Sequence, residues 1–162
     1  MVMSTLVAMN LAECLSEYAA KLRYSDLDSD AILEAKKRIL DSLGCALGAF
    51  DSPPAKAARR VIEKHYPGNA ATMLGTRRKT TADMAAFVNG LMVRYFDFND
   101  SLRGSLTKES AHVSDNIAPC MAVAEYQRRS GRDLLLAIVL AYEINIRLCD
   151  AASLGEWDHV NY

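Results

Sequence analysis

An excess of charge of either sign is absent from this sequence. Its 162 residues hold 19 Lys and Arg against 20 Asp and Glu, which gives a formal net charge of −1 at pH 7. A chain this balanced offers no basic face for the phosphates of nucleic acid or for an anionic membrane surface. We therefore expect no nucleic-acid partner and no membrane partner, and look instead to small molecules or other proteins.

Long apolar runs are also missing. The longest charge-free apolar stretch, residues 134–142, is about half as long as a membrane-spanning helix must be. The N-terminal segment lacks the basic start of a secretory signal and carries Glu13 and Glu17. From these two observations we expect a soluble protein.

Cysteine is scarce and forms no recognisable site. The four cysteines lie far apart, without a C-x-x-C pair or a histidine at ligand spacing: Cys14, Cys45, Cys120 and Cys149. Such spacing is not that of a disulfide framework or a zinc site. Because each lies in an apolar helical pattern, we predict reduced thiols in the core of a cytoplasmic protein and no metal site built from these cysteines.

Apolar residues recur at the three-to-four spacing of amphipathic helices along most of the chain. Caps, prolines and glycines divide the pattern into six predicted helices: 6–22, 30–50, 53–67, 81–96, 115–129 and 134–149. We therefore predict an all-α protein, a bundle of about six helices that forms a single helical domain over residues 1–162. Residues 68–80 form either a short two-stranded ribbon or an extended connection.

Three segments need separate interpretation. The helix over 81–96 is apolar all round, which predicts a buried central helix, and its Asn89-Gly90 pair lacks the alternating flanks of a hairpin. The basic run from Lys56 to Lys64, which includes Arg59, is typical of a solvated face. Residues 103–111 are polar and predict a loop.

Polar and titratable groups are densest between Arg94 and Asn116, where the chain reads RYFDFNDSLRGSLTKESAHVSDN. A carboxylate from Asp97 and an imidazole from His112 are able to divide a proton transfer at neutral pH if they face one pocket. If the preceding helix continued past Phe96, then Asp97, Asp100 and Ser101 would share one face. Solvated acids at a helix end and a capping histidine are the alternative interpretation.

The combination of motifs in this stretch resembles the MmgE/PrpD family, which includes 2-methylcitrate dehydratases and cis-aconitate decarboxylases. The resemblance covers essentially the whole chain. It is carried by Asn89-Gly90, by residues 97–101 (DFNDS), by Lys108-Glu109, by His112 with residues 114–117 (SDNI), and by residues 157–159 (WDH). This loop looks more like that of the dehydratases than the shorter loop of the decarboxylases. Family members usually have Thr in place of Ser101 and Pro in place of Val113.

The resemblance implies a fold and a division of roles. It implies a homodimer of an all-helical domain with a smaller α/β lid, and catalysis without metal or iron-sulfur cluster. Since family members are much longer, we expect this chain to be an N-terminal part, truncated before the lid domain. The substrate would be a small tri- or dicarboxylic acid, with Asp97 and His112 as the acid-base pair. The residues expected to bind substrate are Asn99, Asp100, Ser101, Lys108, Ser114 and His159.

The leading interpretation is therefore a cofactor-independent lyase that removes water from a hydroxy-tricarboxylic acid, as 2-methylcitrate dehydratase does. Alternatives on the same fold are cis-aconitate decarboxylation and epimerisation of a dicarboxylate. A third alternative is a non-catalytic helical dimerisation module that has kept the motif without the lid. A coding continuation after Tyr162 would favour the enzyme over the module.

Overall fold

The computed structural model describes residues 10–103 and 110–151 and confirms the predicted all-α bundle with a short ribbon. Within these ranges there are six α-helices: α1 (Leu11–Lys21), α2 (Ser29–Gly48), α3 (Pro53–His65), α4 (Ala82–Arg94), α5 (Ile117–Tyr126) and α6 (Gly131–Ala151). Two short 3₁₀ helices are also present, η1 (Tyr24–Asp26) and η2 (Val113–Asn116). The strands are β1 (Pro67–Thr72), β2 (Lys79–Thr80), β3 (Leu102–Arg103) and β4 (Ser110–Ala111), in two antiparallel pairs.

Local sequence explains where several helices begin. At α1 the Asn10 side chain accepts the Glu13 N–H at 2.9 Å, and the Glu13 carboxylate accepts the Asn10 N–H at 2.8 Å. The Asp28 carboxylate caps α2 by accepting the Ala31 N–H at 2.6 Å. Pro53 and Pro54 occupy the first turn of α3, where the missing N–H groups would have no helical partner.

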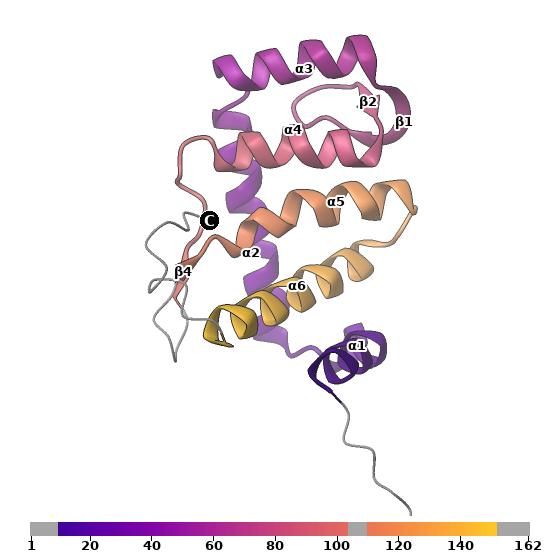
Figure 1. The fold of residues 1–162 in the computed structure, drawn as a ribbon, viewed down its shortest axis with the longest axis vertical. Helices are drawn as coiled ribbons and strands as arrows, with labels where there is room; N and C mark the ends of the chain where they lie inside the picture. Colours follow the sequence, from indigo (N-terminus) through magenta and orange to yellow (C-terminus); the bar gives the residue numbers. More distant parts are fainter. Residues whose placement is uncertain (1–9, 104–109, 152–162) are drawn as a thin grey trace, which may run out of the picture.

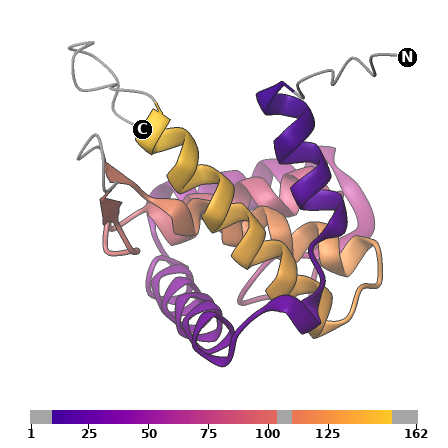
Figure 2. The same ribbon diagram turned by 90° about the horizontal axis from the view of Figure 1, so that it is seen from below.

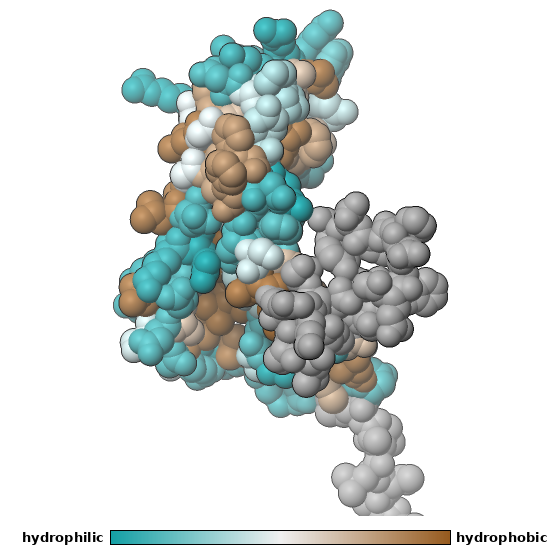
Figure 3. Space-filling model, turned by 90° about the vertical axis from the view of Figure 1, so that its left-hand side faces the viewer, coloured by the Kyte–Doolittle hydropathy of each residue, from teal (hydrophilic) through white to brown (hydrophobic). Residues whose placement is uncertain are grey.

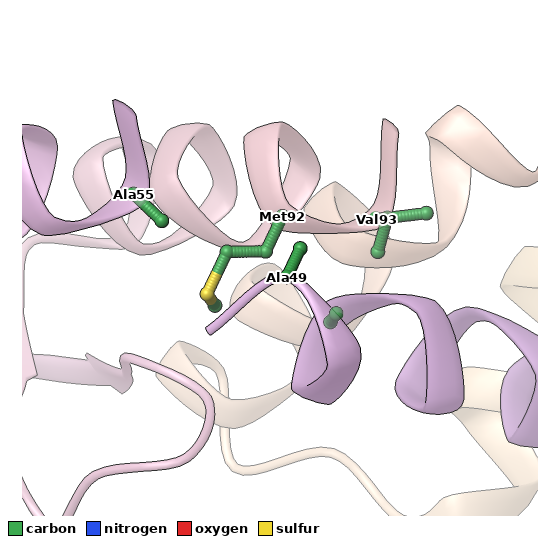
Figure 4. Close-up of a cluster of buried hydrophobic side chains, with 5 residues drawn as sticks. Ala49, Ala55, Met92 and Val93 are labelled. Atoms are coloured by element: carbon green, nitrogen blue, oxygen red, sulfur yellow. The ribbon is translucent and has the colours of Figure 1, made fainter. Parts of the chain in front are cut away.

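Four helices, α3 to α6, are stacked in chain order, and α2 runs across behind them (Figures 1 and 2). The upper part of the core forms where α2, α3 and α4 meet, around Ala49, Ala55, Met92 and Val93 (Figure 4). A second buried cluster joins α2, α5 and α6 through Ala35, Ile117 and Ile138. The small side chains on α2 let it approach both groups of helices closely.

The ribbon of β1 and β2 is fixed to the bundle by buried polar contacts. Asn89 on α4 accepts the Leu74 N–H at 2.9 Å and donates to the Thr72 carbonyl at 2.9 Å. Glu125 on α5 accepts the N–H and the hydroxyl of Thr72, both at 2.7 Å. The Asn89-Gly90 pair therefore lies inside a helix, as predicted, and the side-chain amide of Asn89 binds the backbone of the ribbon.

Four sequence predictions need correction. Phe87 on α4 is 55% exposed, so this helix is not buried all round. Arg59 is buried rather than solvated, because it donates to the Phe50 carbonyl at 2.6 Å and stacks on the Phe50 ring. The predicted loop over 103–111 contains the paired strands β3 and β4, which are too short to leave a period in the sequence. Cys14 is exposed, not in the core, because its helix α1 has no buried residue.

The face at the carboxyl end of α4 mixes hydrophobic and hydrophilic side chains (Figure 3). Tyr95, Phe96 and Phe98 are all exposed; Tyr95 packs edge to face against Phe96, and Phe96 stacks on Phe98. No helix in the described ranges is long and apolar enough to cross a membrane.

We predict that Asn89→Ala destabilises the fold, because it removes the side chain that binds the partly buried Leu74 N–H and Thr72 carbonyl. The expected loss is about 2–4 kcal/mol in the free energy of unfolding, measured by urea denaturation. Asn69→Ala at an exposed position of β1 is the matched control and should change it by less than about 0.5 kcal/mol. Equal stability of the two variants would contradict the role of Asn89.

Candidate functional site

The site begins where α4 ends. The helix stops at Arg94, and Asp97 has a left-handed backbone with φ of 56° while its N–H donates to the Arg94 carbonyl at 3.0 Å. The helix therefore does not continue past Phe96. Asp97, Asp100 and Ser101 do not share a helical face, and each has its own surroundings.

The structure places Asp97 and His112 side by side. The Nε2 atom of His112 lies 3.5 Å from Oδ1 of Asp97, whose side chain is 69% exposed. The other ring nitrogen, Nδ1, lies 3.1 Å from the carbonyl oxygen of Asp100. Because a carbonyl only accepts, the contact with Asp100 requires a proton on Nδ1, and Nε2 is the ring nitrogen that faces the Asp97 carboxylate.

Asp100 lies in the interior, with its side chain 4% exposed. One carboxylate oxygen accepts the Ser114 N–H at 3.0 Å, and the other accepts the Tyr142 hydroxyl at 2.9 Å. The Arg38 Nε atom lies 3.7 Å from the same carboxylate. Burial, with the hydrogen bond to Asp100 next, raises the pKa of Tyr142, so the phenol stays protonated and donates.

Asn99 and Ser114 are both buried and bind each other. The Asn99 amide donates to Ser114 Oγ at 2.9 Å and to Asp115 Oδ1 at 3.0 Å. The Asn99 amide oxygen is buried without a hydrogen-bond partner among the described residues. These contacts join the DFNDS segment to the segment that carries His112.

Arg94 is a site residue whose role the sequence did not indicate. Its guanidinium pairs with Asp97 through Nη1, and its Nε lies 3.8 Å from Asp115 Oδ2. The three-residue spacing of Arg94 and Asp97 was the available signal, but it points to a pair only if the backbone turns after the helix. No spacing in the sequence indicated Tyr142 or Arg38 as site residues, because they lie on α6 and α2, far along the chain from residues 94–116.

The remaining predicted residues divide into two groups. Ser101 is exposed. Lys108 and His159, together with Glu109 and Trp157-Asp158, lie outside the described residues. Within residues 10–103 and 110–151, no group of three or more His, Cys, Asp or Glu side chains could hold a metal ion.

Asp115 makes a testable electrostatic prediction. Burial raises the pKa of its carboxyl, against the opposing effect of Arg94. A carboxyl whose pKa is higher in the folded state stabilises the fold while protonated, and that contribution is lost as pH rises from about 4 through the folded pKa. Asp115→Asn should therefore raise the free energy of unfolding at pH 7, with an advantage that shrinks as pH falls to about 4.

Asp133 is the matched control for this measurement. Hydrogen bonds from the Ser130 N–H and hydroxyl lower the pKa of Asp133, so its contribution is present above its ordinary pKa. Asp133→Asn should be less stable than the parent at pH 7. Urea denaturation at pH 4, 5.5 and 7 checks both signs, and a stabilising effect of Asp115→Asn that is independent of pH would refute the assignment.

Comparison with known proteins gives one family and several relatives. The family model of the MmgE/PrpD N-terminal domain matches residues 13–162. The 2-methylcitrate dehydratase of Salmonella typhimurium is 32% identical over 75% of this chain and 27% of its own length. The 2-methylcitrate dehydratase of Escherichia coli K12 is also 32% identical, over 65% of this chain and 24% of its own length.

A third relative carries a different activity in its name. The cis-aconitate decarboxylase-like protein oryM of Aspergillus oryzae is 25% identical over 88% of this chain and 30% of its own length. This chain thus spans about a quarter to a third of the length of these curated relatives. No solved structure matches the chain. Because the family model covers nearly all of the sequence, the chain belongs to the MmgE/PrpD family and corresponds to its N-terminal domain.

Proposed function

We propose that this domain contributes the acid-base residues of a cofactor-independent hydro-lyase, which removes water from a hydroxy-tricarboxylic acid of the 2-methylcitrate class. The observation that carries the proposal is the contact between Asp97 Oδ1 and His112 Nε2, at 3.5 Å, in a chain of this family. The names of the dehydratase relatives supply the substrate class.

The proposed reaction needs two proton transfers. A base takes the proton from a carbon beside a carboxylate, a carbon-carbon double bond forms, and the hydroxyl on the neighbouring carbon leaves as water after receiving a proton. Asp97 and His112 are within reach of one another and present one carboxylate oxygen and one ring nitrogen, so they can share these two transfers. Ser101, Lys108 and His159 remain the proposed substrate-binding residues. Asn99 and Ser114 are buried and bind each other, so we propose that they support the site rather than touch substrate.

Arg94 adds a cation to this arrangement. A tricarboxylate carries about three negative charges at neutral pH, since carboxyl groups have ordinary pKa values near 4. Arg94 partly offsets the charges of Asp97 and Asp115, which would otherwise repel such a substrate. Asp100 is buried and fully occupied by protein partners, so we now propose that it supports the site rather than touching substrate.

Decarboxylation of cis-aconitate is the second candidate, favoured by the similarity to the Aspergillus oryzae protein. Both reactions act on polycarboxylates and both use proton transfer at carbon. An assay panel of 2-methylcitrate, citrate, cis-aconitate and a hydroxy-dicarboxylate separates them. We further propose a cytoplasmic homodimer, by analogy with the family that the motifs resemble.

We predict that His112→Ala and Asp97→Asn each lower turnover by about 10²–10⁴-fold in the longest protein that the reading frame encodes, because each removes one partner of the acid-base pair. The measurement is the appearance of the unsaturated product by ultraviolet absorbance. Asp133→Asn, far along the chain at the start of α6, is the control and should retain parental turnover. Near-parental rates for both site variants would exclude this function.

The 162-residue chain by itself should show no measurable turnover of 2-methylcitrate. It spans about a quarter to a third of the relatives' length, and a site lacking part of its substrate-positioning groups loses most of its rate. Weak binding should persist and is detected as chemical-shift changes of His112 when 2-methylcitrate is added. Turnover at an enzymatic rate by this chain would show that the domain is sufficient.

A further inference from the structure

We propose that Tyr142 on α6 is a positioning residue for His112 and acts through Asp100. This inference rests on the proposed function for its catalytic meaning, because the role of His112 comes from that proposal. The link itself is structural: the Tyr142 hydroxyl bonds the side chain of Asp100, and the backbone carbonyl of Asp100 bonds Nδ1 of His112, whose Nε2 faces Asp97.

The first step of the path holds the Asp100 side chain. The Tyr142 hydroxyl donates to Oδ2 at 2.9 Å, and the Arg38 Nε lies 3.7 Å from the same oxygen. The Asp100 side chain is only 4% exposed, so water does not replace these partners. A buried carboxylate is strongly destabilised when a partner is removed, which makes its position depend on Tyr142.

The second step transfers that position to His112. Asp100 Oδ1 accepts the Ser114 N–H at 3.0 Å, and the Asp100 carbonyl accepts from His112 Nδ1 at 3.1 Å. One residue therefore holds both the His112 ring and the backbone two residues later. If Asp100 turns or shifts, both contacts change together, and the ring loses the bond that keeps its proton on Nδ1.

Among the described residues, the Tyr142 hydroxyl donates to Asp100 rather than to Asp97 or His112, and its phenol remains protonated at neutral pH. It is therefore not proposed as a proton donor to substrate. What it supplies is a fixed donor for Asp100 from α6, a helix that also packs against β4 and η2 on either side of His112. A tyrosine that only filled space in the α2–α6 interface would leave the state of His112 unchanged when its hydroxyl was removed.

The test is Tyr142→Phe in the 162-residue chain labelled with ¹⁵N-histidine. Nuclear magnetic resonance gives the ratio of the two neutral tautomers of His112, with His65 on α3 as an internal reference. We expect the parent to hold the proton mainly on Nδ1, and the variant to lower the Nδ1–H to Nε2–H ratio by about five- to tenfold, the effect of weakening one hydrogen bond. His65 should not change.

Two further variants keep the result interpretable. Tyr126→Phe removes the hydroxyl of an exposed tyrosine on α5 and should leave the His112 tautomer ratio unchanged. Arg38→Met removes the guanidinium of α2 that lies beside the Asp100 carboxylate, and should change the His112 tautomer ratio in the same direction as Tyr142→Phe. This variant replaces Tyr142→Phe in the test if Tyr142→Phe does not fold. Circular dichroism monitors the fold of each.

An unchanged His112 tautomer ratio in folded Tyr142→Phe, or in folded Arg38→Met if the former does not fold, overturns the proposal. This readout needs no substrate, so a failure of the proposed hydro-lyase function does not affect it. Where the longer protein is active, Tyr142→Phe should lower kcat by about tenfold with little change in KM, because it misplaces a reacting group without removing a substrate contact.

Discussion

The buried carboxylate of Asp100 is the interaction on which the candidate site depends. It is bound from three directions, by Tyr142 on α6, by Arg38 on α2 and by the Ser114 N–H at η2. Burying this carboxylate without these partners would cost several kcal/mol of folding free energy. Asp100 can therefore be buried only because the three partners are present. The bundle and the polar loop are therefore not independent parts, since the packing of α2 against α6 sets where the loop lies.

Most of the helices were predictable because their cores are built from short-range repetition. Apolar residues on α2 and α6 recur every three or four positions. Asp28, Pro53 and Gly131 lie at or just before the first residue of α2, α3 and α6, where their local side-chain and backbone preferences mark the start of a helix. Two of the misses come from tertiary contacts. Arg59 is buried because a carbonyl and an aromatic ring from the end of α2 receive it, and β3 and β4 pair across a loop with no periodic pattern.

The candidate site, too, could be predicted only in part from the sequence. Residue types and spacing were enough to single out Asp97 and His112, because a carboxylate and an imidazole in one polar stretch are uncommon in a chain that is otherwise scaffold. The end of α4 at Arg94 could not be predicted from the sequence. Because the helix ends there, the Asp97 side chain lies at the surface and the Asp100 side chain lies in the interior. Nor could Tyr142 be predicted, which is brought to Asp100 only by the packing of α6.

The left-handed backbone at Asp97 has a consequence for which residues can replace Asp97 during evolution. Glycine takes that conformation without the steric cost, of order 1 kcal/mol, that a side chain incurs there, and Asp is tolerated better than most residues. A chain that kept only its scaffold role would avoid this cost by replacing Asp97 with glycine, which has no Cβ atom. Natural variants with glycine at position 97 would thus mark descendants in which selection acts on folding alone, while retention of the acid would mark those still selected for chemistry.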